Sequence, residues 1–275
     1  MKITETFLTK NPCYIKGQKL KAIQGLMLHS VGCAQPKASA FINTWNSPSY
    51  NRACVHAFID ANDGVIYQTL PWNYFGWHCG GSGNSTHIGV EMCEPDCIKY
   101  TGGTSIKVLN KEKAQDMVQR TYNSAVELFA YLCIKYNLDP LKKGVIVSHK
   151  EGHSLRIATN HGDPEHLWKG VGLNYTMDTF RKDVAEHINK NNKNSEKPKT
   201  EKPSASHNKS TGAQEFKVKT LVADLCIRTG PGTQYVWTGR YTGNGIFTIV
   251  EEKDGWGKLK TPGLGWISLA YCKRV

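Results

Sequence analysis

The sequence predicts an α/β domain with a mixed β-sheet flanked by helices, followed by a small all-β barrel. Three observations support this fold class. Short apolar runs are interleaved with one long amphipathic segment in the first part of the chain. A lysine-rich stretch with almost no apolar residue then interrupts the pattern. From Phe216 onward, short segments rich in Val, Ile, Thr, Tyr and Trp are separated by glycine-containing turns.

Five short segments of the first domain are candidate strands. Two of them are short apolar runs that lead to a histidine, His29 or His149, which is typical of strands buried on both faces. Two others flank the sequence Asn-Asp-Gly at 62–64, a turn signal that predicts a hairpin. The five segments are 23–28, 55–60, 65–70, 87–92 and 144–147.

One long helix is predicted over residues 111–136. Asn110 is available as its N-cap, because a side-chain oxygen at that position accepts a free N–H of the first turn. Strands interleaved with such a helix indicate a sheet that the helix covers. The mainly apolar positions at helical spacing are Ala114, Met117, Val118, Thr121, Ala125, Leu128 and Leu132.

The lysine-rich stretch divides the chain. It buries too little apolar surface to offset the entropy cost of ordering it, so we expect a flexible linker at 190–214. The first domain then covers residues 1–189 and the second covers 215–275. A chain of 275 residues is long enough for one medium and one small core.

The formal net charge of +12 favours an anionic partner. Nucleic acid, an anionic membrane and the phosphate-rich wall of Gram-positive bacteria all fit the sign of the charge, which also serves solubility. No basic recognition helix, zinc-finger spacing or RNA-binding signature is present, so no nucleic-acid partner is expected. The charge alone does not distinguish the remaining partners.

The N-terminal residues lack the apolar core of a signal peptide, and no apolar run reaches the length of a transmembrane helix. Nine scattered cysteines fit a reducing compartment. We therefore expect synthesis in the cytoplasm without a signal peptide or a transmembrane segment. Cys93 and Cys97 could supply two ligands of a metal site, but the sequence has no second cysteine pair nearby to complete it.

Two histidines and one acid form a candidate hydrolytic metal site. A hydrolytic zinc needs three protein ligands and an open position for water. His29, His149 and Asp163 offer suitable atoms. A lone histidine at a strand end is more often structural than a metal ligand. The residue types alone therefore suggest a metal site without establishing it.

The order of several motifs resembles the zinc amidase family Amidase_2, which is akin to the peptidoglycan-recognition proteins. The resemblance extends over nearly all of residues 20–185. The motifs are Leu26-Met27-Leu28-His29-Ser30, Val55-His56-Ala57-Phe58-Ile59-Asp60, Gly76-Trp77-His78, Ile88-Gly89-Val90-Glu91, Val147-Ser148-His149 and Asn160-His161-Gly162-Asp163-Pro164.

The resemblance implies that His29, His149 and Asp163 bind Zn²⁺ and that Glu91 handles protons during hydrolysis. Glu94 and Asp96 are alternative acids close to Glu91. His153 is an alternative ligand, in a loop between His149 and Asp163 that is longer than in many relatives.

Further residues take roles by the same resemblance. Many family members have a lysine two residues before the acidic ligand, where it stabilises the oxyanion; this chain has His161, which does so best when protonated. Trp77, His78 and Asn84 are similar to the wall of the family's substrate groove, although Trp77 also suits a core position.

The segment from 216 to 275 resembles the bacterial SH3 (SH3b) domain. The similarity lies in residues 225–235, in Asp254-Gly255-Trp256-Gly257-Lys258 and in Gly265-Trp266-Ile267. It implies an SH3-like barrel that binds cell-wall peptide or glycan. A barrel that only stabilises or spaces the enzyme is the alternative.

Together the two resemblances predict an N-acetylmuramoyl-L-alanine amidase that acts on bacterial peptidoglycan. Synthesis without a signal peptide suggests a phage or prophage endolysin, with a host autolysin as the alternative. A non-catalytic peptidoglycan receptor and a zinc peptidase that cuts the stem peptide are the competing functions. The sequence leaves the oligomeric state open.

Overall fold

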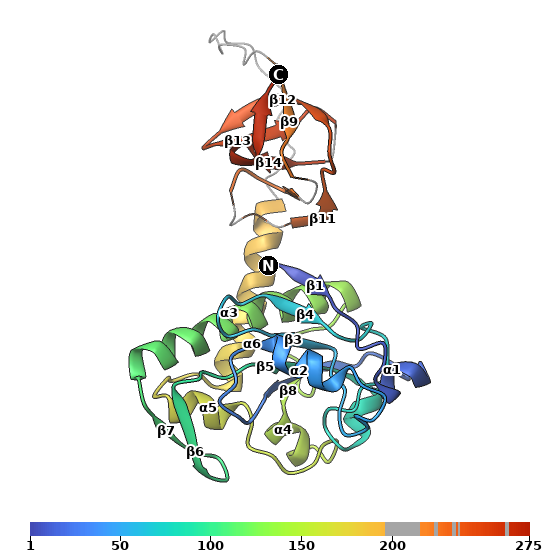
Figure 1. Cartoon of the computed structure of the whole chain (residues 1–275), viewed down its shortest axis with the longest axis vertical. Helices are drawn as coiled ribbons and strands as arrows, with labels where there is room; N and C mark the ends of the chain where they lie inside the picture. The colour runs from blue at the N-terminus through green and yellow to red at the C-terminus, as the bar shows by residue number, and fades with distance from the viewer. Residues whose placement is uncertain (196–214, 223–224, 233–234, 236, 262–263) are drawn as a thin grey trace. The chain divides into compact units, whose positions relative to one another are not determined.

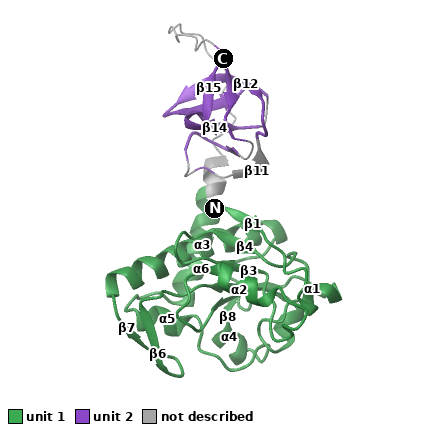
Figure 2. Ribbon diagram, viewed as in Figure 1, with its two compact units in different colours: residues 1–190 green, residues 191–275 purple. Residues whose placement is uncertain are grey.

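The computed structural model describes residues 1–195, 215–222, 225–232, 235, 237–261 and 264–275. The chain forms two compact units, Met1–Lys190 and Asn191–Val275 (Figure 2). Among the described residues, no helix is both long and apolar enough to cross a membrane.

A six-stranded mixed sheet forms the centre of the first unit (Figure 1). β3 and β4 are antiparallel, and the other neighbouring pairs are parallel. In spatial order the strands are β1 (Ile3–Glu5), β4 (Ile66–Gln68), β3 (Ala57–Ile59), β5 (His87–Met92), β2 (Gly25–Ser30) and β8 (Ile146–Ser148).

Helices cover the sheet, and α3 is the longest of those described in full. Asn110 accepts a hydrogen bond from the N–H of Lys113 at 3.1 Å, which confirms the predicted N-cap. The helices of the first unit are α1 (Pro12–Lys16), α2 (Ala38–Trp45), η1 (Ser82–Ser85), α3 (Lys111–Tyr136), α4 (His149–Ser154), α5 (Glu165–Gly170) and α6 (Met177–Ser195).

The two faces of the sheet have different neighbours. Leu26 and Leu28 of β2 belong to the large core that also contains buried residues of α3, α5 and α6. Met27 points to the other face, into a small cluster with Val147 of β8. Because side chains alternate along a strand, His29 lies on the same face as Met27. This face presents the candidate site.

Two strands end later than the sequence suggests. His29 lies inside β2, and His149 begins α4 directly after β8. Burial of all six residues of β2, polar His29 and Ser30 included, explains the difference, because backbone pairing and tertiary contacts extend the strand beyond its apolar run.

A separate hairpin projects from the first unit. β6 (Ile98–Gly102) and β7 (Ser105–Val108) pair as an antiparallel two-stranded sheet. Gly103, with φ of 53°, lies in the turn between them. This hairpin is not among the elements predicted from the sequence.

The start of the expected linker is helical. α6 continues to Ser195, so residues 190–195 belong to a helix rather than to a flexible segment. Lysine favours helices, and a polar helix end can be solvated on all sides. The rest of the predicted linker, 196–214, lies outside the described residues.

The second unit is all-β, as predicted. It contains a seven-stranded antiparallel sheet around a core that includes Ile227, Ile249 and Ile267. Asp254 and Gly255, both with positive φ, form the tight turn between β12 and β13. In spatial order the strands are β11 (Trp237–Tyr241), β10 (Cys226–Arg228), β14 (Trp266–Ser268), β13 (Trp256–Leu259), β12 (Ile246–Lys253), β9 (Phe216–Thr220) and β15 (Cys272–Arg274), with η2 (Leu269–Tyr271) before β15.

Candidate metal centre

The three predicted zinc ligands meet in space. One potential ligand atom from each of His29, His149 and Asp163 lies within 4.8 Å of the others, and all three residues are buried. The two histidine Nδ1 atoms are 3.1 Å apart. Asp163 Oδ2 lies 3.1 Å from His29 Nδ1, and its Oδ1 lies 3.5 Å from His149 Nδ1.

Strand pairing explains why the two histidines are neighbours. β2 and β8 are parallel, with Leu28 opposite Ser148. His29 and His149 each follow one member of that pair, so they emerge at the same edge of the sheet. Asp163 comes from the loop before α5 and completes the group.

The charges of the group suit a cation. Burial disfavours a charge on His29, but the hydrogen bond to Asp163 and the fields of Glu91 and Asp163 outweigh burial and raise the pKa of His29. The pKa of Asp163 is lowered, because the contact with His29 outweighs burial of the carboxylate. Burial, followed by repulsion from His29, lowers the pKa of His149 to about 4. An ionised carboxylate therefore lies beside the two imidazole rings, which favours a cation at their shared point.

The donor set fits zinc. Two imidazole nitrogens and one carboxylate oxygen form a ligand set that zinc accepts in hydrolytic sites. The Nε2 atom of each ligand histidine faces a protein group instead: His78 Nδ1 for His29 at 3.0 Å, and Thr159 Oγ1 for His149 at 3.2 Å. Both Nδ1 atoms are thus the ones that face the shared point, as a common metal ion requires.

Glu91 lies on β5 beside the metal group. It is paired in register with His29 across the parallel strands, and both side chains lie on the same face. Its Oε2 is buried and has no hydrogen-bond partner among the described residues. Burial raises the pKa of Glu91 to about 7. Such a carboxyl group can exchange a proton near neutral pH.

The metal group and Glu91 line a groove of about 1040 Å³. Trp45, Tyr50 and Trp77 supply aromatic surface to it. The β6–β7 hairpin contributes Tyr100 and Thr104. The hairpin was not predicted, although residues 98–108 alternate apolar and polar side chains around Gly-Gly, which is a signal for such an element.

The predicted groove residues Trp77, His78 and Asn84 have different surroundings. Trp77 and His78 line the groove. Both ring nitrogens of His78 have protein partners, His29 Nε2 at 3.0 Å and the carbonyl oxygen of His87 at 3.1 Å. Asn84 is not part of the lining, and its side-chain oxygen accepts from the N–H groups of His78 and Cys79. The Asn84 oxygen thus holds the loop, and a substrate contact by Asn84 stays a prediction.

His161 lies on the groove wall and is exposed. Its Nδ1 is 3.2 Å from His149 Nε2, so it borders the metal group without belonging to it. The alternative ligand His153 lies on α4 with its Nδ1 3.4 Å from the carbonyl oxygen of Ala158, and it does not belong to the metal group either.

The alternative acids lie elsewhere. Glu94 is fully buried and accepts hydrogen bonds from Gly32 and Tyr100. Asp96 forms an ion pair with Lys113. Neither acid lines the groove, whereas Glu91 does.

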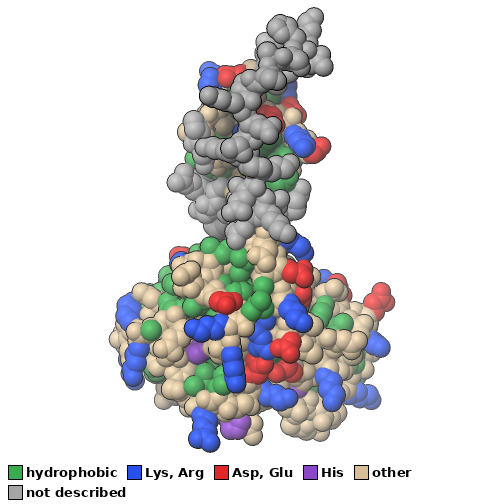
Figure 3. Space-filling view, turned by 180° about the vertical axis from the view of Figure 1, so that it is seen from behind, with side chains coloured by type: hydrophobic (Ala, Val, Ile, Leu, Met, Phe, Trp, Pro, Cys, Tyr) green, Lys and Arg blue, Asp and Glu red, His purple; other side chains and the backbone are tan. Residues whose placement is uncertain are grey.

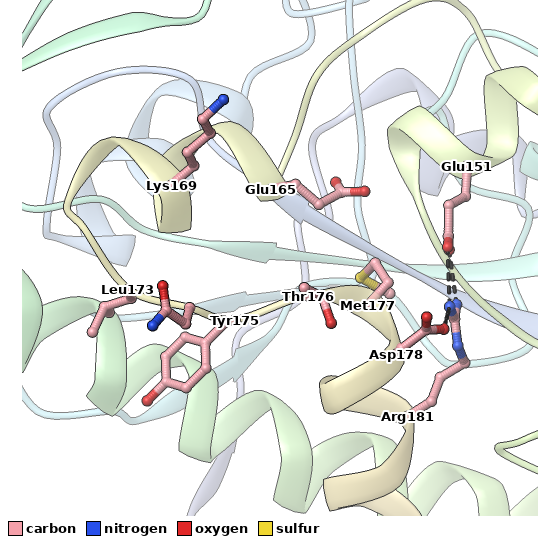
Figure 4. A pocket seen from close by; sticks show the side chains of 10 residues that line it. Glu151, Glu165, Lys169, Leu173, Tyr175, Thr176, Met177, Asp178 and Arg181 are labelled. Atoms are coloured by element: carbon pink, nitrogen blue, oxygen red, sulfur yellow. Dashed lines mark hydrogen bonds and ion pairs between the residues drawn. The ribbon is translucent and has the colours of Figure 1, made fainter.

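A second pocket, of about 520 Å³, is lined by residues of α4, α5 and α6 and of the segment before α6 (Figure 4). Figure 4 shows Glu151 of α4 joined to Arg181 of α6, which also pairs with Asp178. None of the predicted site residues lines this pocket. The Glu151–Arg181 ion pair joins α4 to α6, and Arg181 also donates to the carbonyl oxygen of Ile146 in β8.

The comparisons with known proteins agree on one family. The family Amidase_2, described as N-acetylmuramoyl-L-alanine amidase, matches residues 19–166, which is just over half of the chain. Protein Ami of Listeria monocytogenes is 27% identical over 158 residues, 55% of this chain and 15% of its own length. The N-acetylmuramoyl-L-alanine amidase XlyA of Bacillus subtilis is 56% identical over 36 residues, 12% of each chain.

A solved structure has a similar fold. The hydrolase AmiA of Staphylococcus aureus, crystallised with its ligand, is 23% identical and covers 68% of this chain and 83% of its own, with a TM-score of 0.50. The curated relatives named above are much longer than the segments matched, so the likeness concerns parts of those proteins. The extent of the family match is decisive, and the chain belongs to the N-acetylmuramoyl-L-alanine amidase family Amidase_2.

Proposed function

We propose that this protein is a zinc-dependent N-acetylmuramoyl-L-alanine amidase that cleaves the amide between the lactyl group of muramic acid and L-alanine in peptidoglycan. The observation that supports this most directly is the His29, His149 and Asp163 group in a groove that also exposes Glu91. Family membership supports the choice of bond.

Each group has a definite task in this proposal. His29, His149 and Asp163 would hold zinc, which would supply a Lewis acid for the amide carbonyl and for water. Glu91 accepts the water proton and delivers it to the departing amine of L-alanine. His161 donates a hydrogen bond to the oxyanion, and does so most strongly when protonated.

The aromatic side of the groove suits a substrate that contains both sugar and peptide. Trp77, with Trp45 and Tyr50, offers flat apolar surface against which a sugar ring packs. We assign peptidoglycan binding to this wall.

We assign the second unit to wall binding as a bacterial SH3 domain, and residues 190–214 to the connection between the units. The all-β architecture is consistent with that assignment. With a wall-binding unit behind it, the amidase would act as an endolysin of phage or prophage origin, or as a host autolysin.

Product analysis tests the activity. Purified sacculi are digested with the zinc-loaded protein, and new chain ends are identified by mass spectrometry and amino-group labelling. We expect free L-alanine N-termini together with lactyl carboxyl groups. New amino ends at another stem residue would indicate a peptidase, and tight binding without any cleavage would indicate a receptor.

Two variants test the assigned residues. Glu91→Gln should keep zinc and the fold but lower turnover by about 100-fold to 10,000-fold, since an amide of nearly the same shape cannot accept the proton. Asp163→Ala, or treatment with a chelator, should remove zinc and activity together. Full turnover by Glu91→Gln, or full zinc content in Asp163→Ala, would contradict the assignment.

A further inference from the structure

His78 lies between the proposed ligand His29 and strand β5. We propose that His78 is a positioning residue, which holds His29 in the tautomer whose Nδ1 lone pair faces the metal position. This inference rests on the proposed zinc site and assigns His78 a role other than substrate binding.

The positions of the protons follow from one carbonyl group. His78 Nε2 lies 3.1 Å from the carbonyl oxygen of His87, which can only accept, so Nε2 of His78 carries a hydrogen. In a neutral ring the other nitrogen, Nδ1, is then an acceptor. It lies 3.0 Å from His29 Nε2, which must therefore donate. His29 Nδ1 is left to bind a metal ion.

The backbone around His78 is shaped to admit its ring. Gly89 of β5 lies under the imidazole: a Cβ at that position would come within 2.5 Å of His78 Cγ. Gly76 is also close to the ring, since a Cβ there would lie 2.9 Å from His78 Cδ2. A side chain at either position would displace the ring, so both glycines maintain the contact between His78 and His29.

The loop that carries His78 is itself held in place. The side-chain oxygen of Asn84 accepts from the N–H groups of His78 and Cys79, each at 2.9 Å. The carbonyl oxygen of Cys79 accepts from Thr159 Oγ1 at 3.2 Å, and Thr159 Oγ1 in turn accepts from His149 Nε2 at 3.2 Å. His78 thus contacts the ligand His29 directly, and the next residue, Cys79, is linked to the ligand His149 through Thr159.

A neighbouring histidine provides a matched control. His56 is buried, and its Nε2 donates to the carbonyl oxygen of Tyr74 at 2.8 Å while its Nδ1 accepts from the N–H of Gly89 at 3.0 Å. His56 therefore makes the same pair of hydrogen bonds as His78. The difference is that its donor partner is a backbone amide rather than a metal ligand.

Two substitutions at position 78 separate positioning from packing. The amide of glutamine occupies the place of Nε2, so His78→Gln keeps the bond to His87 and loses the acceptor for His29. The amide of asparagine occupies the place of Nδ1, so His78→Asn keeps an acceptor for His29. Loss of such a partner of a metal ligand weakens metal binding by roughly 10-fold to 100-fold.

The experiment measures the zinc dissociation constant of the full chain by competition with a chromogenic chelator. We expect His78→Gln to weaken binding by about 10-fold to 100-fold. His78→Asn should stay much closer to wild type, and His56→Gln should match wild type despite its own lost hydrogen bond. Equal zinc affinity in His78→Gln and wild type, or equal losses in His78→Gln and His56→Gln, would overturn the proposal.

Nitrogen NMR of the zinc-loaded protein gives a second readout. In wild type, His29 should show a protonated Nε2 whose hydrogen exchanges slowly with water, and this exchange should become faster in His78→Gln. A His29 ring protonated at Nδ1 would refute the proposal. Neither measurement depends on cleavage, so a protein that binds zinc as described but leaves peptidoglycan intact would refute the amidase function and not the role of His78.

Discussion

Glu94 is a buried carboxyl group close to the groove, and its pKa depends strongly on burial in the folded protein. It is fully buried, with hydrogen bonds from the N–H of Gly32 at 2.9 Å and from Tyr100 Oη at 2.8 Å. Burial outweighs these bonds and raises the pKa of Glu94 to about 7. The folded protein therefore retains a proton that the unfolded chain releases near pH 4.5.

This difference predicts how stability depends on pH. Between about pH 4.5 and 7 the folded state binds more protons at Glu94 than the unfolded state, so stability falls as pH rises through this window. The stabilisation from protonated Glu94 is complete below pH 4.5, the pKa of Glu94 in the unfolded chain. It is lost above about pH 7, the pKa of Glu94 in the folded protein. The change is on the order of 3 kcal/mol. Glutamine does not titrate, so Glu94→Gln should remove this part of the slope.

Hydrogen exchange of the β5 amides in the zinc-free protein measures this pH dependence. The exchange rate of these amides reports the opening of the first unit, independently of the second. The free energy of opening is compared at pH 5 and pH 8 after correction for the intrinsic exchange rate. Asp96→Asn, a change at a half-exposed side chain, is the control and should keep the wild-type slope. An unchanged slope in Glu94→Gln would show that Glu94 does not titrate in this range.

Single residues were predictable from the sequence to different degrees. His29, His149 and Asp163 were found because their motifs resemble a family, and the structure brings them together. The hydrogen bonds of His78 were not predictable, since they depend on where the fold places Gly89 and the carbonyl group of His87 relative to the ring. A sequence motif identifies a residue but not the direction of its hydrogen bonds.

At the scale of elements, Ser148 fixes the start of α4 and thereby the position of His149. Its Oγ accepts from the N–H of Glu151 at 3.0 Å, and the Glu151 carboxylate accepts from the N–H of Ser148 in return. The same hydroxyl donates to Glu165 Oε1 at 3.0 Å. The other oxygen of Glu165 is buried without a hydrogen-bond partner among the described residues.

Ser148→Ala should therefore destabilise the first unit more than an ordinary cap deletion does. Loss of the cap costs about 1 kcal/mol, and a buried acceptor left without its donor costs a further ~1–3 kcal/mol. Asn110→Ala is the matched control, because Asn110 caps the exposed start of α3 and its side chain has no second buried partner among the described residues. Exchange of the β5 amides measures both variants, and equal losses would mean that the bond to Glu165 contributes nothing.

Elements were predictable where local signals agree. Residues 111–136 form α3 with the predicted bounds, because the cap, the apolar period and the helix propensities coincide. The ends of β2 and β8 were less well predicted, since strands buried on both faces lack the alternation that marks a strand boundary. The β6–β7 hairpin was not predicted, although residues 98–108 alternate apolar and polar side chains and the hairpin lines the groove.

At the scale of the whole molecule, the formal net charge of +12 is the property that bears most directly on partners. On the face of the first unit that Figure 3 shows, Lys and Arg side chains alternate with Asp and Glu, and the described residues of this face form no continuous basic patch. On this face, the distribution suits weak attraction to an anionic wall better than recognition of nucleic acid. Attraction between the basic protein and an anionic wall would add to the specific wall binding proposed for the second unit.

Deletion of residues 215–275 tests the proposed division of labour. If the second unit binds the wall, it raises the local concentration of the amidase near insoluble sacculi without altering the active site. We expect the truncated protein to bind sacculi more weakly and to lyse them more slowly. Cleavage of a small soluble muramyl-peptide should remain nearly unchanged, and this serves as the control for an intact first unit.

A salt series separates specific binding from charge attraction. Electrostatic capture weakens as ions screen it, because the screening length falls from about 10 Å at 0.1 M salt to about 3 Å at 1 M. Binding in a specific pocket depends less on salt, so the advantage of the full-length protein should persist at high salt. An advantage that disappears at high salt would mean that the second unit contributes charge alone. Equal sacculus binding by both proteins at every salt concentration would refute a wall-binding role for residues 215–275.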